Sequence, residues 1–358
     1  MNTVIIMAGG TGGHIYPALA VGTALRDRGV KVFWMGVRDG LESRLARDQG
    51  FEFDSVRTQG VWGKGVTRWL TMPLWLSVAI LQCVSIILRR RPDALLGMGG
   101  YVCGPGGLAG WLLRRPLVIH ESNFIPGLTN RALAFLATRI LTGFEDTAIA
   151  GRPIWVGVPV RGSIIATGVS RDLSDLEAHR PLNLLVVGGS QGAQSLNEGL
   201  PQAVAELPAD LMPKIRHQSG AGRGDDTVRR YRIHAVDAEV TEYIDDMSEA
   251  YRWADVIVAR AGAMSLAEIS VVGLAAVLVP FPYAAKDHQR INAEIFKDRD
   301  CALVCMEGDQ FIPCLVGHLR TILGDRVLIR KMSQRIRQMA RTDSTELVAT
   351  NCIDVMQS

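Results

Sequence analysis

Short apolar runs recur along the chain, and several are followed by a glycine-rich turn and then by a longer segment of helical periodicity. The first run is Val4–Met7; the glycines of AGGTGGH come next, and a helix is predicted over Pro17–Arg28. Similar units start in LLGMGGYVCGPGGLAG, residues 95–110, and in LVIHESNFIPGLTNRALA, residues 117–134. Strands that alternate with helices in this way predict a parallel sheet with helices on both faces.

A polar stretch over Ser170–Arg180 interrupts this alternation, and the same pattern then starts again. Leu182–Val187 is predicted to be a strand, and a turn with three glycines and another helix follow it. The final helical stretch, Met332–Val355, is expected to pack back on the first half of the chain. Later strands are expected near Ile215–Gln218, Val240–Ile244, Val256–Ala259 and Ala276–Val279.

The length of 358 residues is too great for one ordinary core and suits two domains. We therefore predict an α/β fold with two Rossmann-like, doubly wound parallel-sheet domains that face a deep cleft. The predicted domains span residues 1–162 and 163–339, and a C-terminal helix at about 340–358 is expected to pack on the first of them. Ligands of such folds bind beyond the carboxyl ends of the strands.

Composition and charge exclude several classes of protein. With 48% hydrophobic residues, 37 glycines and a formal net charge of +3, the chain is typical of a globular α/β protein and is too weakly charged for bulk nucleic-acid binding. The six cysteines form no CxxC pair, so buried thiols are expected rather than metal ligands. The chain enters its first strand without a basic leader, so we expect no signal peptide.

The glycine turns match neither the dinucleotide-binding fingerprint nor the P-loop. Counted from Gly10 and Gly12, the third glycine of the fingerprint would fall on Ile15, and the turn at Gly188 is broken by Ser190. A P-loop also needs a serine or threonine directly after its lysine, but Gly65 follows Lys64. Glycine nevertheless lets a backbone approach a ligand closely, and the helix that follows each turn favours a phosphate or a polar sugar.

One segment is long enough to cross a bilayer: Trp69–Leu88 contains 20 residues without a charge. We reject a membrane span, because a strand-and-glycine unit follows at once and a span would put two strands of one sheet on opposite sides of the membrane. A buried core helix is the plainer interpretation of most of these residues.

The flanks of this segment favour contact with a membrane surface instead. From Gly60 to Arg115 the chain holds seven basic residues and one acid. Basic residues beside tryptophans are typical of proteins that rest on an anionic membrane surface without crossing it. The residues expected to make this contact are Trp62, Lys64, Arg68, Trp69, Trp75 and Leu76.

The stretch DVIVARAGAMSLAEISVVGLAAVLVPFPYAAKDHQRINA, residues 255–293, carries much of the candidate chemistry. A helix that opens near Ala263–Ser265 offers free N–H groups to a diphosphate. Glu268 lies about one turn into this helix, where its carboxylate either accepts hydrogen bonds from both hydroxyls of a ribose or, more plainly, interacts with the helix dipole. The groups suited to the hydroxyls of a sugar are Asp287, His288, Gln289 and Asn292.

Eight motifs, in the same order, resemble those of the MurG family of bacterial peptidoglycan glycosyltransferases and cover nearly the whole chain. They are GGTGGHIYPALAV, GMGGYVCGPGGLAG, HESNFIPGLTNR, GVPVR, GGSQGAQSLN, EYIDDM, RAGAMSLAEI and DHQRINA. The resemblance implies the GT-B fold, inversion at the anomeric carbon, and no metal or other cofactor. It implies transfer of N-acetylglucosamine from UDP-N-acetylglucosamine to the C4 hydroxyl of lipid I, the undecaprenyl-diphosphate-linked muramyl-pentapeptide, giving lipid II.

The resemblance also implies where the protein works. It places the enzyme peripherally on the cytoplasmic face of the plasma (inner) membrane, in cell-wall synthesis and hence in cell shape and division. Its implied partners are the UDP-N-acetylglucosamine donor, the lipid I acceptor, an anionic membrane surface and other cell-wall synthesis proteins, with no nucleic acid. The chain departs from the family where HESN replaces HEQN, where GVPVR replaces GNPVR, and where Ala259 replaces a serine.

Residue by residue, the resemblance implies a donor site and an acceptor site. In the C-terminal domain Glu268 takes the ribose hydroxyls and the backbone of Ile244 reads the uracil edge, while Asn123 either contacts the sugar or simply caps a helix. The donor-site residues are Thr11, Gly12, Gly13, Asn123, Arg161, Ser190, Ile244, Ala263, Met264, Ser265, Leu266, Ala267, Glu268, His288 and Gln289. The N-terminal domain is expected to hold the acceptor diphosphate at Gly12, Gly13, Gly100, Tyr101, Gly104, Gly106 and Gly107.

Inversion in a single displacement needs a base that takes the proton from the acceptor hydroxyl. His14 is the candidate, because an imidazole ordinarily titrates near neutral pH. A plainer interpretation is that His14 only hydrogen-bonds the acceptor diphosphate or caps its helix. Glu121 is the alternative base, or the partner that orients His14. Helix N-termini and Arg161 are expected to stabilise the leaving diphosphate.

Two other functions fit part of the pattern. A UDP-sugar epimerase of the same fold would bind the same nucleotide sugar but would need no acceptor and no basic apolar surface. A non-catalytic sensor of nucleotide sugars would use the donor-site residues and leave His14 idle. Incubation with UDP-N-acetylglucosamine alone separates the epimerase, which changes the sugar, from the other two.

Overall fold

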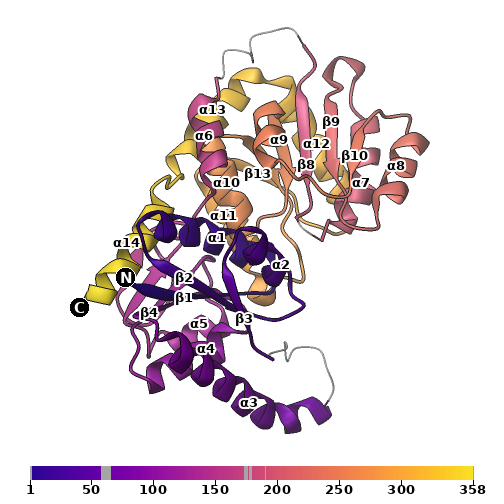
Figure 1. Cartoon of the computed structure of the whole chain (residues 1–358). Helices are drawn as coiled ribbons and strands as arrows, with labels where there is room; N and C mark the ends of the chain where they lie inside the picture. Colours follow the sequence, from indigo (N-terminus) through magenta and orange to yellow (C-terminus); the bar gives the residue numbers. More distant parts are fainter. Residues whose placement is uncertain (1, 58–65, 173–175, 177–179, 190, 358) are drawn as a thin grey trace. The chain divides into compact units, whose positions relative to one another are not determined.

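The computed structural model describes residues 2–57, 66–172, 176, 180–189 and 191–357. They form two compact units, one of Met1–Arg161 with Arg341–Ser358 and one of Gly162–Ala340. Each unit is built on its own parallel sheet with helices packed against it (Figure 1). The predicted α/β class with two doubly wound parallel sheets is therefore confirmed.

The first unit has, in the part of the chain that is described, a seven-stranded parallel sheet of order β3-β2-β1-β4-β5-β6-β7. Its strands are β1 (Thr3–Ala8), β2 (Lys31–Gly36), β3 (Glu52–Ser55), β4 (Ala94–Gly99), β5 (Leu117–Glu121), β6 (Arg139–Thr142) and β7 (Pro153–Trp155). Its helices are α1 (Gly12–Asp27), α2 (Leu41–Asp48), α3 (Val66–Arg90), α4 (Cys103–Leu112), α5 (Leu128–Leu133) and α14 (Ser344–Gln357). The strand order reverses between β1 and β4, and ligands bind at such switch points.

Side chains of β1 alternate between two cores, as the two-residue period of a strand requires. Val4 and Ile6 pack in the core that α1 and α14 cover, whereas Ile5 and Met7 pack in the core that α3 and α4 cover. All four are fully buried. Burial on both faces explains why this strand is a continuous apolar run in the sequence.

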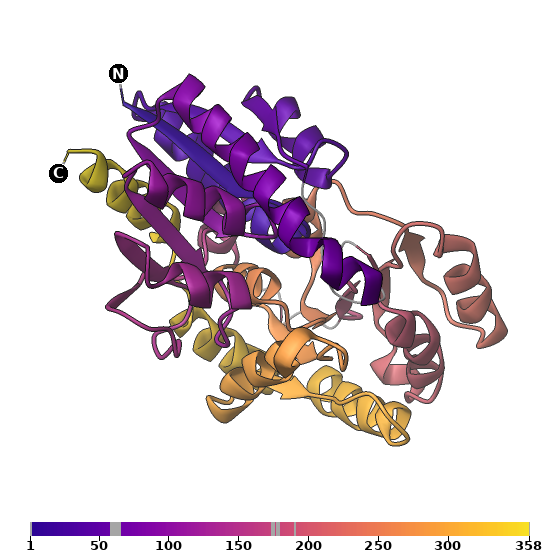
Figure 2. The ribbon, with the colours of Figure 1, turned by 90° about the horizontal axis from the view of Figure 1, so that it is seen from below.

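The last helix, α14, packs on the first unit beside α1, close to the start of the chain in both views (Figure 2). Its apolar side, with Cys352 on it, enters the same core as α1. Two arginines of the unit hold its polar side: Arg28 donates to Thr350 at 2.9 Å, and Arg139 donates to Asn351 at 2.7 Å. The chain therefore returns to its first unit after completing the second.

The second unit has a six-stranded parallel sheet of order β10-β9-β8-β11-β12-β13 within the described residues. Its strands are β8 (Asn183–Val187), β9 (Lys214–Gln218), β10 (Glu239–Thr241), β11 (Val256–Ala259), β12 (Ala275–Leu278) and β13 (Ala302–Val304). Its helices are α6 (Gly162–Ser170), α7 (Gln194–Ala205), η2 (Ala209–Leu211), α8 (Gly224–Ile233), α9 (Met247–Trp253), α10 (Ala263–Val272), η3 (Ala285–Asp287), α11 (His288–Asp298), α12 (Phe311–Gly324) and α13 (Arg326–Gln338).

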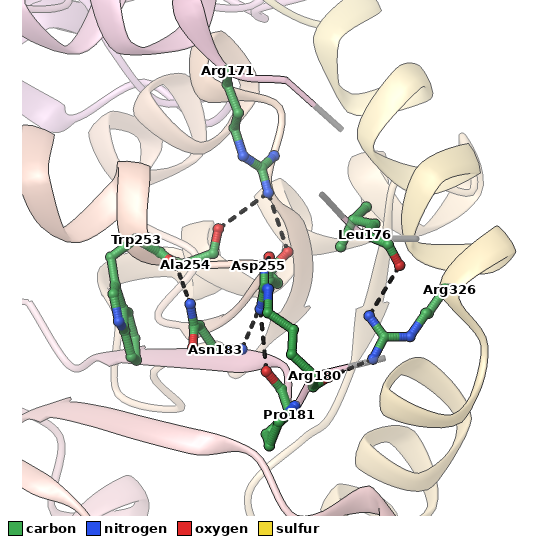
Figure 3. Close-up of polar contacts among 9 residues, drawn as sticks. All are labelled: Arg171, Leu176, Arg180, Pro181, Asn183, Trp253, Ala254, Asp255 and Arg326. Carbon is green, nitrogen blue, oxygen red and sulfur yellow. Dashed lines mark hydrogen bonds and ion pairs between the residues drawn. The ribbon is translucent and has the colours of Figure 1, made fainter. Parts of the chain in front are cut away.

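A network of polar contacts ties the segment before β8 to the amino-terminal ends of β8 and β11, the two central strands of this sheet (Figure 3). Asp255 accepts hydrogen bonds from Arg180 at 2.6 and 2.9 Å and from the backbone N–H of Asn183 at 2.8 Å. Arg171 donates to two backbone carbonyls next to β11, and its burial lowers its pKa to about 10. Arg326 adds two bonds to backbone carbonyls of the same segment. The described residues Arg171, Leu176 and Arg180 of the polar stretch thus take part in the contacts at the start of these strands.

Three element boundaries differ from those predicted. The first helix begins at Gly12 rather than at Pro17, because the glycines of the turn already adopt the helical conformation. Strand β10 ends at Thr241, so Ile244 lies in the loop beyond it. The final helical stretch is two helices, α13 in the second unit and α14 in the first, separated by residues 339–343.

Helix α3 contains the long uncharged segment, and Pro73–Arg90 is, within the described residues, the one stretch long and apolar enough to cross a membrane by length and composition. One side of it enters the core of the first unit through Ala79, Cys83, Ile86 and Ile87. The opposite side exposes Leu74, Leu81 and Leu88. Trp75 and Leu76 are also exposed, because they lie earlier in the helix than the buried residues that begin at Ala79. The expectation of a core helix buried over most of its length is wrong here, because 22% of Pro73–Arg90 is buried.

The cysteines are free thiols, and all but Cys314 are buried, which confirms the expectation for those five. The Sγ of Cys103 lies 3.2 Å from the carbonyl oxygens of Met7 and of Gly99, and burial raises its pKa to about 12. No group of three histidine, cysteine or acidic side chains within the described residues is arranged to hold a metal ion.

Candidate active site

The turn after β1 leads straight into α1 and carries His14. Thr11 is the N-cap of α1 and is extended, but its side chain makes no capping hydrogen bond. The N–H groups of the first turn are therefore without a side-chain cap, and such groups favour an anion. The imidazole of His14 lies against the backbone of Gly99, at the end of β4: a Cβ on Gly99 would be 2.4 Å from Nδ1.

The turns after β1 and β4 pack back to back. The N–H of Gly9 donates to the carbonyl oxygen of Gly99 at 3.2 Å, and a Cβ on Gly100 would lie 2.3 Å from the carbonyl oxygen of Gly9. Gly99 and Gly100 have φ angles of 114° and 93°, which favour glycine. Tyr101 follows them and is 53% exposed. Three of the predicted site residues therefore lie at this pair of turns: Gly100, Tyr101 and His14.

Two of the glycines predicted to cradle the acceptor diphosphate have a different role. Gly106 and Gly107 lie inside α4 and are buried. A Cβ on Gly106 would be 2.3 Å from Sδ of Met7, and one on Gly107 would be 2.7 Å from Leu133. These glycines let α4 pack closely on β1 and α5. Gly104 differs, because its nearest neighbour would be at an ordinary contact distance of 3.7 Å.

His120, near the end of β5, is fully buried and holds the GVPVR segment. Its Nε2 donates to the carbonyl oxygen of Gly157 at 2.8 Å, so Nδ1 is left as the acceptor for the hydroxyl of Ser122 at 3.3 Å. Burial lowers the pKa of His120. Both of its ring nitrogens take part in hydrogen bonds within the first unit, so His120 has a structural role.

Glu121 is 2% exposed and accepts hydrogen bonds from four donors. Oε1 accepts from the backbone N–H of Asn123 at 2.9 Å and from its side-chain amide at 3.3 Å. Oε2 accepts from the N–H of Gly127 at 3.0 Å and from the amide of Asn130 at 2.9 Å. This carboxylate organises the loop between β5 and α5. Asn130, which the sequence analysis did not single out, also donates to the carbonyl oxygen of His120 at 3.1 Å.

Arg161 lies at the end of the first unit, with its guanidinium carbon 4.8 Å from the centre of the Tyr16 ring on α1. Tyr16 is two residues after His14 in the sequence of α1. Gly157, in the same motif, has a φ of 81°, and a Cβ there would be 2.4 Å from the hydroxyl of Ser344. Val158, where the family has asparagine, is buried. The motif therefore packs against the start of α14.

In the second unit the helices α7, α8, α10, α11 and α12 begin without a side-chain cap, and α7 and α10 are the two that follow the predicted donor-site turns. Gly262 is the N-cap of α10, and Ala263, Met264 and Ser265 form its first turn. Leu266 follows them and is buried. Ala267 is partly exposed.

The turn between β8 and α7 contains Ser190, which lies outside the described residues. Gln218, 4% exposed, holds this turn by donating to the carbonyl oxygen of Gly189 at 3.3 Å. Gly192 packs on the next turn, where a Cβ would lie 2.0 Å from the carbonyl oxygen of Ser219. Sequence reasoning missed Gln218, although a polar residue at the end of a buried strand is a usable signal.

Glu268 is 5% exposed on α10, and Tyr251 of α9 donates a hydrogen bond to its Oε2 at 2.8 Å. A buried carboxylate that is held by a tyrosine hydroxyl has a fixed orientation. The dipole of α10 alone does not account for such a partner. The sequence indicated Glu268 but gave no sign of Tyr251.

The predicted sugar-binding residues lie where α11 begins. Lys286 and Asp287 both have positive φ angles, 54° and 57°, so the chain makes a strained left-handed turn just before His288. The side-chain oxygen of Gln289 accepts from the backbone N–H of Phe281 at 3.0 Å. Asn292 is fully buried and donates to the carbonyl oxygen of Ala261 at 3.2 Å, so it joins α11 to the turn before α10.

Arg260 was not singled out from the sequence, yet it joins three parts of this site. It is 8% exposed, it forms an ion pair with Glu307, and it donates to the hydroxyl of Ser195 at 3.2 Å. It also donates to the carbonyl oxygen of Val279 at 3.0 Å, next to the segment that bonds Gln289. Its signal in the sequence is a charged residue at the end of a buried strand.

The residues predicted to contact a membrane are only partly described. Trp62 and Lys64 lie outside the described residues, and of Arg68 and Trp69 only the helical backbone is described. Trp75 is 57% exposed and Leu76 is 39% exposed. At the other end of α3, Arg90 forms ion pairs with Glu52 at 2.7 Å and with Asp54 at 2.8 Å. That part of the basic flank is therefore neutralised within the protein.

Known families and structures match the chain over nearly its whole length. Models of the glycosyltransferase family 28 N-terminal and C-terminal domains match residues 4–142 and 183–346. A protein of Nitrosococcus oceani is 45% identical over 98% of this chain and 98% of its own length. One of Thiobacillus denitrificans is 46% identical over 98% and 97%. Both are named UDP-N-acetylglucosamine--N-acetylmuramyl-(pentapeptide) pyrophosphoryl-undecaprenol N-acetylglucosamine transferase.

Solved structures agree with this result. MurG of Acinetobacter baumannii is 34% identical, with a TM-score of 0.81 over 99% of this chain and 100% of that one. The calicheamicin glycosyltransferase CalG4 has a TM-score of 0.70 at 14% identity, and MnaA of S. aureus with UDP has 0.71 at 12%. CalG4 and MnaA resemble this chain in fold alone.

Proposed function

The chain belongs to glycosyltransferase family 28, and from this we infer that it transfers N-acetylglucosamine from UDP-N-acetylglucosamine to lipid I, giving lipid II for peptidoglycan synthesis. The observation that carries this conclusion is the match, at 45% identity over 98% of both chains, to a transferase of that name. The protein is an enzyme of the N-acetylglucosaminyltransferase class. The assignments of individual residues that follow are proposals.

We propose that the second unit binds the donor. The uncapped N–H groups of α10 hold the diphosphate, with the turn before α7 beside them. Glu268, held by Tyr251, accepts the ribose hydroxyls. His288 and Gln289 contact the sugar, and the backbone near Ile244 contacts the uracil. Support comes from their positions, because all of these except Glu268 follow the carboxyl end of a strand or begin a helix.

The first unit is proposed to bind the acceptor diphosphate at the paired turns after β1 and β4. Gly12 and Gly13 supply N–H groups in the first turn of α1, and Gly100 and Tyr101 approach from the other turn. Gly104 is the one glycine of α4 in the predicted set that packing leaves available. These groups act on the phosphate oxygens without any side-chain charge.

His14 is proposed to be the base. It takes the proton from the C4 hydroxyl of the acceptor as that oxygen forms a bond to the anomeric carbon, and the bond from this carbon to the UDP oxygen breaks with its electron pair. Glu121 is a weaker candidate, because both of its oxygens already accept two hydrogen bonds each. Arg161 and the helix N-termini stabilise the charge that develops on the diphosphate.

We also propose that the exposed side of α3 rests on an anionic membrane surface. Leu74, Leu81 and Leu88 are spaced by seven residues, so they lie on one side of the helix, and each is more than half exposed. Trp75 and Leu76 add exposed apolar side chains earlier in α3 than the buried residues that begin at Ala79. An enzyme whose acceptor is anchored in a bilayer gains from such a contact, since it restricts the search for the acceptor to two dimensions.

Transfer of radiolabelled N-acetylglucosamine to a short-chain lipid I analogue tests the function. Wild type is expected to make the disaccharide lipid. His14→Ala is expected to lose transfer while binding UDP-N-acetylglucosamine with unchanged affinity in calorimetry. His234→Ala, a histidine at the end of α8 in neither half of the site, is the matched control and keeps activity.

The outcomes separate the possible functions. A wild type that binds the donor but transfers nothing supports the sensor, and a changed sugar without acceptor supports the epimerase. Transfer by His14→Ala at the wild-type rate removes His14 as the base and leaves the transferase assignment intact.

A further inference from the structure

Glu42, in the first turn of α2, is a buried carboxylate that the proposed mechanism does not use. It is 1% exposed, and its Oε1 accepts a hydrogen bond from the N–H of Val37 at 3.0 Å. Its Oε2 is also buried and has no hydrogen-bond partner among the residues that the structure describes. Leaving such an oxygen unpaired costs free energy, so its position calls for an explanation.

The carboxylate fills a space bounded by three glycines. A Cβ on Gly9 would lie 2.7 Å from Oε1, one on Gly40 would lie 2.4 Å from Oε2, and one on Gly36 would lie 2.7 Å from Cγ. Each distance is shorter than real Cβ contacts, so a side chain at any of these positions would displace that of Glu42. The side chain therefore wedges the loop after β2 against the turn after β1.

The turn that Glu42 supports is joined to the surface on which His14 rests. Gly9 donates its N–H to the carbonyl oxygen of Gly99 at 3.2 Å, and Gly100 packs directly on the carbonyl group of Gly9. The imidazole of His14 lies against Gly99. No side chain separates these backbones, so a displacement of Gly9 is passed on to Gly99.

We propose that Glu42 is a positioning residue that sets the place of the His14 imidazole through the backbones of Gly9 and Gly99. The proposal rests on the function inferred above in one respect, the role of His14 as the base. Glu42 itself is not proposed to contact substrate. Its side chain holds the loop after β2 against the turn after β1, and its hydrogen bond to Val37 fixes the position of that side chain. A displacement of about 1 Å at a reacting group can cost on the order of 100-fold in rate, so the wedge matters for turnover.

The test compares Glu42→Ala, Glu42→Asp and Glu42→Gln in the full chain. The imidazole chemical shifts of His14, identified by their loss in His14→Gln, report its position without reference to activity. In Glu42→Ala we expect them to move and turnover of the lipid I analogue to fall on the order of 10- to 100-fold. Glu42→Asp is one methylene shorter and tests the same wedge if the alanine variant does not fold. Glu42→Gln keeps the volume and the acceptor for Val37, and is expected to match wild type.

A matched control separates positioning from general destabilisation. Asp54 is a buried acid of the same unit, ion-paired with Arg90. Asp54→Ala is expected to lower stability and leave the His14 shifts unchanged. Affinity for UDP-N-acetylglucosamine is expected to stay at the wild-type value in every Glu42 variant.

Unchanged His14 shifts in a folded Glu42→Ala or Glu42→Asp protein would overturn the proposal, and so would equal changes in Glu42→Gln. Moved shifts with full turnover support the wedge and remove His14 as the base. A wild type without transferase activity refutes the function, while the shifts still decide the role of Glu42.

Discussion

The hydroxyl of Tyr251 donates a hydrogen bond of 2.8 Å to Oε2 of Glu268. Tyr251 lies on α9 and Glu268 on α10, and their exposed fractions are 1% and 5%. Because water has little access, the bond holds the carboxylate in one orientation. The proposed ribose ligand is therefore positioned before the donor arrives.

Tyr251→Phe removes this hydroxyl and keeps the ring. We expect the affinity for UDP-N-acetylglucosamine to fall about fivefold, from the loss of roughly 1 kcal/mol of orientation, with a small change in kcat. Calorimetry with the donor measures this affinity. Tyr231→Phe is the control, because Tyr231 is equally buried but bonds His217 at 3.0 Å. Equal donor affinity in wild type and Tyr251→Phe would contradict the positioning role.

Gly106→Ala and Gly104→Ala distinguish packing from ligand binding on α4. The first puts a methyl group 2.3 Å from the Met7 sulfur, so we expect the free energy of unfolding to fall by about 1–3 kcal/mol. The second meets only an ordinary contact at 3.7 Å, so stability is kept and the KM for the acceptor rises. Urea unfolding and steady-state kinetics measure the two effects. A stable Gly106→Ala protein would refute the packing role.

Asp255 ties the segment before β8 to the sheet through Arg180 and Asn183 (Figure 3). Asp255→Asn leaves Arg180 without its charged partner, and we expect the free energy of unfolding to fall by about 1–3 kcal/mol. The lower end applies because Arg180 is 36% exposed. Asp226→Asn is the control, since its ion pairs on α8 are exposed and no measurable change is expected.

Burial lowers the pKa of His217 to about 3, whereas an unfolded histidine titrates near 6.5. Between these values the unfolded chain binds the additional proton, so stability is full above about pH 6.5 and falls as the pH falls, by up to about 1.4 kcal/mol per pH unit. His217→Phe is expected to flatten this slope in urea unfolding at a series of pH values. An unchanged slope would show that other groups cause the acid sensitivity.

Trp75→Glu with Leu76→Glu tests the membrane surface. Both side chains are exposed on α3, so folding is expected to be kept while binding to vesicles of anionic lipid is lost in sedimentation. Val169→Glu is the control, because this residue is 83% exposed on α6 of the second unit. Transfer to a short-chain, water-soluble acceptor is expected to remain at the wild-type rate. Vesicle binding by the double variant would refute the proposal.

The sequence by itself determined the fold class, the glycine turns and the strands that precede them. The reason is local: strands buried on both faces are apolar runs, as Val4–Met7 and Leu182–Val187 show, and a turn that must approach a ligand needs glycine. The order of the motifs then indicated the family, and most of the motifs include or directly follow the carboxyl end of a strand in one of the two sheets.

Only the tertiary structure decided what individual residues do there. Gly104 and Gly106 look equivalent in the sequence, but only Gly106 faces Met7 of a strand almost 100 residues away. The sequence indicated Glu121 as an alternative base, but in the fold four donors already bond its carboxylate. Nothing in the sequence indicated Glu42, whose side chain lies against three glycines. Such roles depend on contacts between distant segments, which no local pattern of residues records.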